Sequence, residues 1–218
     1  MLRVLCVRWG DKYGPEYTER LRRAVERYLK VPHEFVEVRD NPPSTLPVCW
    51  QKVGLFRPGA FPGMNLYLDL DIVIHSDITW ILDEYEPGRV TMIDDFRHGY
   101  RHPWAGTSEK TRTVTPELLA RLGGLHVCNS SIMLWNGHDP GPQRVWTEFD
   151  PRVMKTLAGD QNWTSQVLRE DGLCLLGEDW AGSYRYHYRK GLRRPITIFH
   201  GHPKPGDLAD AEVLRDWL

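Results

Sequence analysis

The stretch Leu66-Tyr-Leu-Asp-Leu-Asp-Ile-Val-Ile74, written LYLDLDIVI, places two carboxylates in an otherwise apolar run. Such a run predicts a long strand near the centre of a sheet. Side chains alternate between the faces of a strand, so Asp69 and Asp71 are expected to project to the same side. Two like charges on a half-buried face repel each other and resist desolvation. We therefore expect a positive charge between them, and a divalent cation is the simplest candidate.

The overall charge favours no large anionic partner. The chain has 218 residues and a formal net charge of −1, from 28 Lys plus Arg and 29 Asp plus Glu. It therefore has no global field that would collect nucleic acid or anionic lipid. The run from Arg185 to Arg194 is rich in basic residues and mixes them with aromatic residues. It fits either a binding site for an anionic or sugar-bearing partner or an ordinary exposed loop.

The cysteines and the apolar runs indicate in which cellular compartment the chain is expected. Four separated cysteines form no C-x-x-C pair, which argues against a zinc site or a redox motif. The N-terminal apolar piece, Val4 to Val7, is too short for a signal peptide, and no run reaches membrane-spanning length. We expect no transmembrane segment and a cytoplasmic location.

The order of the predicted elements indicates an α/β fold. A strand at Arg3–Val7, a helix from Pro15 and a strand at His33–Val38 predict a parallel βαβ unit. Further strands are predicted at 89–93, 127–135 and 196–199, and helices at 50–56, 116–122, 143–149 and 160–169. The long irregular segment 95–115 could shape an acceptor site or a lid. No repeat or linker interrupts the chain, so we expect a single domain over 1–218.

A third metal ligand is expected near the end of the chain. The last predicted strand runs into His200-Gly-His-Pro-Lys-Pro205, which offers two imidazoles beside turn-forming residues. Manganese accepts both carboxylate and imidazole ligands, and it keeps coordination positions for phosphate oxygens. His200 and His202 are both candidates, and Lys204 could neutralise phosphate charge.

Six motifs in order carry a family resemblance: VRWGDKYGPEYTERL, WQKVGLF, LYLDLDIVI, CNSSIMLWN, GDQNWTSQVL and FHGHPKP. The chain resembles GT-A-fold glycosyltransferases, and most of all the family 8-like enzymes that use nucleotide-sugar donors. The resemblance implies a GT-A (Rossmann-like) fold with a mixed, mostly parallel central sheet flanked by helices. Residues 1–94 would form the nucleotide-binding half, and 95–218 the acceptor and sugar half with the late metal-ligand His.

The resemblance also assigns roles to residues. It implies Mn²⁺ (or Mg²⁺) held by Asp69, Asp71 and His200. It implies a site for a nucleotide-sugar donor, most simply a UDP-sugar, at Val7, Arg8, Tyr13, Lys52, Asp69, Leu70 and Lys204. It implies that Asn129, Asp160 and Gln161 bind the transferred sugar. The tail departs from the family pattern, because HGHPKP is shorter than the family's H-x-x-G-x-x-K-P.

The implied activity is transfer of a sugar to a saccharide or another hydroxyl-bearing acceptor. If the anomeric configuration is retained, as family 8 suggests, no strong base is needed near the acceptor. If it is inverted, a carboxylate must deprotonate the acceptor hydroxyl, and Asp95 or Asp160 would be the candidates.

Two other functions fit part of the sequence. A phosphohydrolase of the haloacid dehalogenase type has a first motif like Asp69-Leu-Asp-Ile-Val73, and Asp94 and Asp95 resemble its later acidic motif. That class needs a Lys between the two motifs, and none occurs there. A nucleotide-sugar-binding module without activity is the other alternative, although retention of both aspartates and of His200 favours a working metal site.

Overall fold

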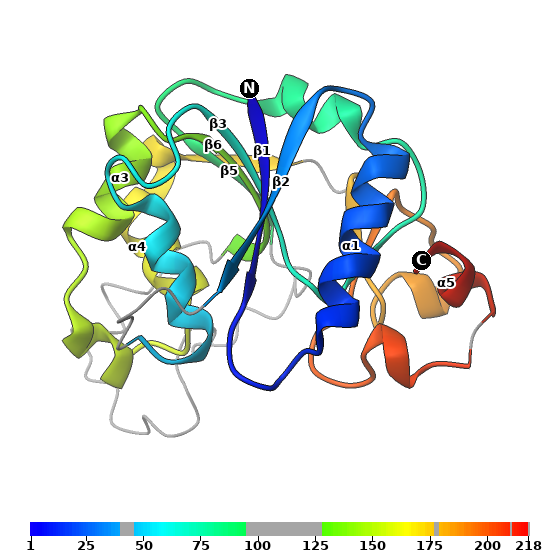
Figure 1. Ribbon diagram of the computed structural model, residues 1–218. Helices are drawn as coiled ribbons and strands as arrows, with labels where there is room; N and C mark the ends of the chain where they lie inside the picture. The colour runs from blue at the N-terminus through cyan, green and yellow to red at the C-terminus, as the bar shows by residue number, and fades with distance from the viewer. Residues whose placement is uncertain (40–45, 95–127, 177–178, 210, 218) are drawn as a thin grey trace.

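A six-stranded mixed sheet forms the centre of this computed structural model, which describes residues 1–39, 46–94, 128–176, 179–209 and 211–217 (Figure 1). The strand order is β2-β1-β3-β6-β5-β7. Neighbouring strands run parallel in the β1–β2, β1–β3 and β5–β7 pairs, and β6 runs antiparallel to β3 and β5. The strands are β1 Leu2–Arg8, β2 His33–Arg39, β3 Met64–Leu68, β5 Val90–Asp94, β6 Cys128–Asn136 and β7 Leu173–Leu176.

A second sheet of three strands, in the order β4-β9-β8, lies beside the first. Its strands are β4 Ile72–Ile74, β8 Ala181–Ser183 and β9 Ile196–Ile198. The α-helices are α1 Pro15–Tyr28, α3 Pro140–Thr147, α4 Asp160–Gly172 and α5 Ala211–Asp216. Short 3₁₀ segments are η1 Val48–Phe56, η2 Thr79–Glu84, η3 Pro151–Lys155, η4 Tyr188–Lys190 and η5 Pro205–Asp207.

The large sheet separates two apolar cores. Along β3, Leu66 and Leu68 pack with α1 and the small sheet, whereas Tyr67 packs with η1, α3 and α4 on the other face. The same alternation puts Leu134 of β6 in the first core and Trp135 in the second. Figure 1 shows α1 and α5 on one side of the sheet and α3 and α4 on the other. The sheet is thus covered on both faces, as its apolar strands require.

Most of the predicted elements are confirmed. Strand β1 pairs in parallel with β2 across α1, from Leu2 opposite His33 to Arg8 opposite Arg39. Pro15 begins α1, where its missing N–H costs nothing, and the apolar face of the helix packs on the sheet. The polar start of β6 coincides with an irregularity in its pairing with β5, where Met92 lies opposite Met133 and Ile93 opposite Asn129.

The prediction of one continuous strand over LYLDLDIVI is wrong. Strand β3 ends at Leu68, residues 69–71 lie outside any strand, and β4 begins at Ile72 in the other sheet. The expectation that Asp69 and Asp71 share one strand face therefore fails as well. The interior of a strand does not solvate two acids that are two positions apart, whereas a chain that leaves the sheet allows each acid to contact its own partners.

Some elements were not predicted, and some predictions fall outside the described residues. Strands β7 and β8 and helix α5 are short and carry weak sequence signals. The predicted irregular segment 95–115 and the predicted helix 116–122 lie outside the described ranges. Within those ranges, no helix is both long and apolar enough to cross a bilayer.

Replacement of Leu66 by Ala should test the central position of β3. Leu66 is fully buried between the sheet and α1. We expect Leu66→Ala to lower the free energy of unfolding by about 2–5 kcal/mol, because it removes buried methyl groups and leaves a cavity. Urea denaturation measures the loss. Leu175→Ala is the matched control: this strand residue is 45% exposed, and its truncation should cost less than about 1 kcal/mol. Equal losses in the two variants would contradict the fold.

Candidate active site

Several chain segments meet where β1 and β3 end. These strands are parallel neighbours, so their carboxyl ends lie at the same edge of the sheet. Strand β6 is antiparallel to β3, with Leu68 opposite Ile132, so its first residues come to that edge as well. The backbone N–H of Asp69 donates to the carbonyl of Ser131 at 2.9 Å, and the N–H of Phe199 donates to the carbonyl of Asp71 at 3.2 Å. The carboxyl edge of a parallel sheet is where α/β folds bind ligands.

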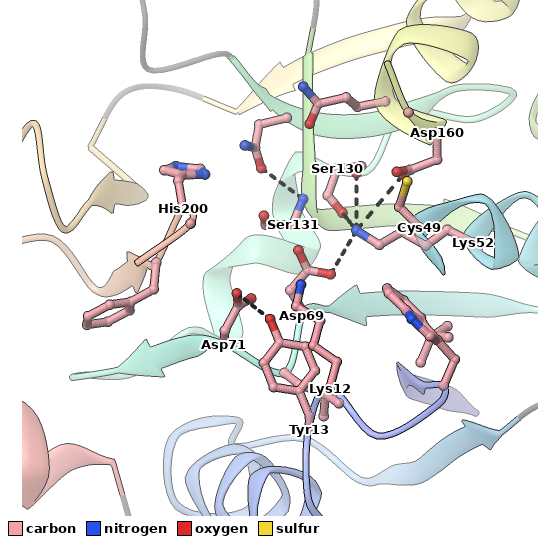
Figure 2. A pocket seen from close by; sticks show the side chains of 18 of the residues that line it. Lys12, Tyr13, Cys49, Lys52, Asp69, Asp71, Ser130, Ser131, Asp160 and His200 are labelled. Carbon is pink, nitrogen blue, oxygen red and sulfur yellow. Dashed lines mark hydrogen bonds and ion pairs between the residues drawn. The ribbon is translucent and has the colours of Figure 1, made fainter. Parts of the chain in front are cut away.

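A pocket of about 320 Å³ opens at this edge (Figure 2). Its wall comes from the β1–α1 loop, η1, the β3–β4 break, the start of β6, the start of α4 and the segment after β9. The lining residues are Val7, Trp9, Lys12, Tyr13, Cys49, Lys52, Asp69, Leu70, Asp71, Asn129, Ser130, Ser131, Ala158, Gly159, Asp160, Gln161, Asn162, Phe199, His200, Gly201 and Lys204. Of the residues that the resemblance assigns to the metal, the donor and the sugar, all except Arg8 are in this set. Arg8 instead pairs with Glu37 of β2, with Nε and Oε1 2.9 Å apart.

Asp69 is neutralised by a buried lysine. Lys52 Nζ lies 2.8 Å from Asp69 Oδ1 (Figure 2). The Tyr67 hydroxyl donates to the same oxygen at 2.7 Å. Burial alone would raise the pKa of Asp69, but the Lys52 ammonium and the hydrogen bonds hold that pKa below its ordinary value. Burial and the neighbouring carboxylate together raise the pKa of Tyr67, so its hydroxyl stays a donor. Asp69 is therefore an ionised carboxylate in the folded protein.

Lys52 also holds Asp160, the first residue of α4. Its Nζ lies 3.9 Å from Asp160 Oδ2 and contacts the carbonyl and hydroxyl oxygens of Ser130 at 3.3 and 3.2 Å. Burial tends to lower the pKa of Lys52, but Asp69 and Asp160 raise it above its ordinary value, so the side chain stays charged. Burial raises the pKa of Asp160, and Lys52 opposes that shift. Among the described residues, Oδ2 of Asp160 has no hydrogen-bond partner.

Asp71 has a second lysine and a second tyrosine. Its Oδ2 accepts a hydrogen bond from the Tyr13 hydroxyl at 2.7 Å and another from Lys204 Nζ. Burial and the Asp71 charge raise the pKa of Tyr13, so its hydroxyl is a donor at neutral pH. The two acids of the LYLDLDIVI stretch thus each contact one lysine and one tyrosine. A positive charge was expected between the two acids, and each acid instead has its own lysine, from a distant part of the sequence.

The two candidate histidines lie in different environments. His200 lines the pocket, opposite Lys52 in Figure 2. The side chain of His202 is 86% exposed and lies 3.4 Å from Asp207. Gly201, which lies between them, has a φ of +65°, a left-handed conformation that glycine adopts without strain. Of the two, only His200 is therefore placed to contact a molecule in this pocket.

The remaining predicted residues come from β6 and α4. Asn129 Oδ1 accepts the backbone N–H of Ser131 at 2.9 Å, which shapes the irregular start of β6. Gln161 is the second residue of α4 and lines the pocket beside Asp160. Sequence reasoning missed Trp9 and Lys12, although both lie in the loop from which Tyr13 was selected. It also missed Ser130, which follows Asn129 and contacts Lys52.

The pocket contains the types of ligand that a hard divalent cation prefers. Asp69, Asp71 and His200 supply two carboxylates and an imidazole to one cavity, a donor set that suits Mn²⁺ or Mg²⁺. In this structure both carboxylates are paired with lysines, Asp69 with Lys52 and Asp71 with Lys204. In the described ranges, no three His, Cys, Asp or Glu side chains are grouped closely enough to hold a metal as they stand. These residues are therefore of the types that bind such a metal. Asp71 would have to release Lys204 in order to bind it.

Comparisons with known proteins support the fold. No protein-family model matches the sequence, and a search of curated proteins finds no significant match. The galactosyltransferase LgtC, solved in complex with donor and acceptor sugar analogues, is 15% identical over 99% of this chain and 100% of its own, with a TM-score of 0.62. The bifunctional glycosyltransferase WbbM is 12% identical over 94% of this chain and 46% of its own, with a TM-score of 0.67.

A third match is a glycosyltransferase involved in glycosylation of the major capsid of PBCV-1. It is 12% identical over 99% of this chain and 97% of its own, with a TM-score of 0.60. At these identities the likeness establishes the fold. The chain has the GT-A fold, an α/β arrangement with a mixed, mostly parallel sheet, and the fold predicted from the sequence is confirmed.

Removal of the Lys52 charge should destabilise the protein. Lys52→Met leaves Asp69 and Asp160 buried without their cation, and such a loss costs about 3–5 kcal/mol. Chemical denaturation at pH 7 measures the effect. Lys12→Met is the matched control, because Lys12 lines the same pocket but is exposed, and it should cost less than about 1 kcal/mol. Adding Asp160→Asn to Lys52→Met should restore part of the stability, and no restoration would contradict the assigned ion pair.

Proposed function

We propose that this protein is a metal-dependent glycosyltransferase that moves a sugar from a nucleotide-diphosphate donor, most simply a UDP-sugar, to a hydroxyl-bearing acceptor. One observation carries the proposal. On a GT-A fold, the side chains that the family resemblance marks for metal, diphosphate and sugar line a single pocket, although they come from six separate segments. Side chains gathered for packing alone would not combine three lysines and three aspartates in one cavity.

The nucleotide end of the donor would lie against the β1–α1 loop. Val7 and Trp9 offer apolar surface there, and Tyr13 offers a ring beside a hydroxyl that is already bound to Asp71. Lys12 is exposed at the pocket wall, and Lys204 reaches into the pocket from the segment after β9. Ammonium groups at these two points would attract the diphosphate and offset its charge.

The proposed metal ligands are Asp69, Asp71 and His200. When bound there, a divalent cation would act as a Lewis acid and template for the departing diphosphate. Lys204 would assist by donating a hydrogen bond to a phosphate oxygen as negative charge develops on the leaving group. Lysines pair with both acids, but Lys52 is also held by Asp160 and Ser130, whereas the Lys204 ammonium can move away, so we expect Asp71 to be the stronger of the two carboxylate ligands.

The transferred sugar would lie between α4 and the start of β6. Asp160 Oδ2 is a buried acceptor without a hydrogen-bond partner among the described residues, and it lies at the pocket wall. Buried acceptors normally have a partner, so a sugar hydroxyl would satisfy it. Asn129 and Gln161 add amide groups within the same cavity. Their positions support the proposed sugar-binding role.

We propose retention of the anomeric configuration. Lys52 and burial hold Asp160 in a fixed environment at the start of α4, which suits orienting a sugar hydroxyl. An inverting reaction would need a carboxylate base for the acceptor hydroxyl. Asp160 is one candidate for that base. The other candidate, Asp95, lies outside the described residues.

The two alternatives are less well supported. The matched structures are glycosyltransferases, so the fold gives no support to a phosphohydrolase in which Asp69 would be the nucleophile. Asp69 is also engaged by Lys52 and Tyr67, which lowers its nucleophilicity. A binding module without activity would share the same pocket, and a turnover measurement distinguishes it from an enzyme.

A panel of nucleotide sugars, assayed for donor hydrolysis or transfer with and without Mn²⁺, tests the proposal. We expect turnover of a UDP-sugar that requires the metal. Asp71→Asn should lower kcat/KM on the order of 10²-fold or more, because it weakens a ligand that acts on the leaving group. Asp83→Asn, which changes an exposed aspartate of η2, is the matched control and should retain activity.

Four results would contradict parts of this proposal. If the wild type neither binds nor turns over any nucleotide sugar, the proposed function is wrong. If it binds a donor without any turnover, the binding module is favoured. If Asp71→Asn is as active as the wild type, the metal assignment is wrong. Formation of a product with the opposite anomeric configuration would overturn retention alone.

A further inference from the structure

We propose that Lys204 controls metal binding at Asp71, so that the cation and the donor diphosphate bind together and the cation alone binds weakly. In the ligand-free protein the Lys204 ammonium forms an ion pair with the Asp71 carboxylate. A bound diphosphate would draw the ammonium away and leave Asp71 to the metal. This inference rests on the proposed function, which supplies the diphosphate.

The contacts of Asp71 oppose a cation. Lys204 Nζ and the Tyr13 hydroxyl both donate to Oδ2, and the Lys204 and Asp71 side chains are only 12% and 11% exposed. A divalent cation at Asp71 would lie within a few ångströms of the ammonium. At an effective dielectric constant between that of a protein surface and that of water, this repulsion is worth at least tenfold in affinity. The cation can bind well only after Lys204 moves.

Lys204 has a fixed backbone and a movable end. Its backbone N–H donates to Asp207 Oδ2 at 2.8 Å, and its carbonyl accepts the N–H of Asp207 at 3.0 Å, so the start of η5 is closed. The ammonium also donates to the carbonyl of Phe199 at 3.2 Å and lies 5.8 Å from the centre of the Tyr13 ring. A lysine side chain has four methylene groups and can change rotamers while its backbone stays in place. Movement of the ammonium from Asp71 to a nearby phosphate oxygen therefore requires no change in the fold.

The charges in the pocket favour joint binding. Lys12, Lys52 and Lys204 balance Asp69, Asp71 and Asp160, so the ligand-free cavity is close to neutral. A divalent cation alone or a diphosphate alone would leave an excess charge in a partly buried site. The two together restore the balance, and the phosphate oxygens give the Lys204 ammonium an anionic partner. Each ligand should therefore raise the affinity for the other by the same factor.

Mn²⁺ binding to the nucleotide-free protein tests the inference without any activity assay. Free Mn²⁺ is measured by electron paramagnetic resonance during titration of the wild type, Lys204→Met and Lys12→Met. We expect Lys204→Met to bind Mn²⁺ about tenfold more tightly than the wild type, or better. Lys12→Met removes the same charge from the same pocket, but its ammonium lies over the Tyr13 ring, and we expect a change of less than about threefold. Adding Asp71→Asn to Lys204→Met should abolish the gain.

The outcomes separate this inference from the proposed function. Equal Mn²⁺ affinity in the wild type and Lys204→Met, or equal gains in both lysine variants, would overturn the role of Lys204. Lys204→Arg keeps the charge and should bind Mn²⁺ as weakly as the wild type. In the wild type, saturating UDP should raise Mn²⁺ affinity more than it does in Lys204→Met. If UDP does not bind at all, the proposed donor is wrong, whereas the nucleotide-free comparison still decides the inference.

Discussion

The desolvation of two neighbouring carboxylates is the constraint on which the rest of this structure depends. Asp69 and Asp71 cannot continue a buried strand, so the chain leaves the large sheet after Leu68 and joins the small sheet at Ile72. Each acid then contacts its own lysine and tyrosine. The break connects the two sheets and also supplies the polar floor of the pocket. One local charge problem therefore explains both the division of the strands and the place of the site.

Much of the fold could be predicted from the sequence because the patterns that specify its elements are local. The apolar run at the N-terminus, Pro15 at the start of α1 and the alternation in β2 predict the βαβ unit without reference to the rest of the chain. The break within LYLDLDIVI was not readable in the same way, because apolar residues on both sides of the acids fit a continuous strand. Short elements such as β8 were missed since three residues carry too little periodicity. In both cases packing against distant parts of the chain, and not the local sequence pattern, determines the structure.

The residues that line the pocket could mostly be predicted from the sequence, whereas the contacts among them could not. The resemblance pointed to residues that line the pocket, but it did not show that Lys52 bridges Asp69 and Asp160 or that Lys204 contacts Asp71 across 133 positions of sequence. Arg8 illustrates the limit, because neighbouring strand β2 offers Glu37 and the side chain pairs there. The choice between His200 and His202 likewise needed the structure, in which His200 lines the pocket and His202 is exposed. Ion pairs between distant segments follow from packing, which the sequence does not display.

A crystal structure of the protein with UDP and Mn²⁺ tests the central claim most directly, because anomalous scattering locates the metal independently of the nucleotide. The account predicts Mn²⁺ bound by Asp69, Asp71 and His200, with the diphosphate beside it and the Lys204 ammonium on a phosphate oxygen. Nucleotide bound away from this pocket, or a diphosphate that leaves Lys204 on Asp71 with no metal between them, would contradict it.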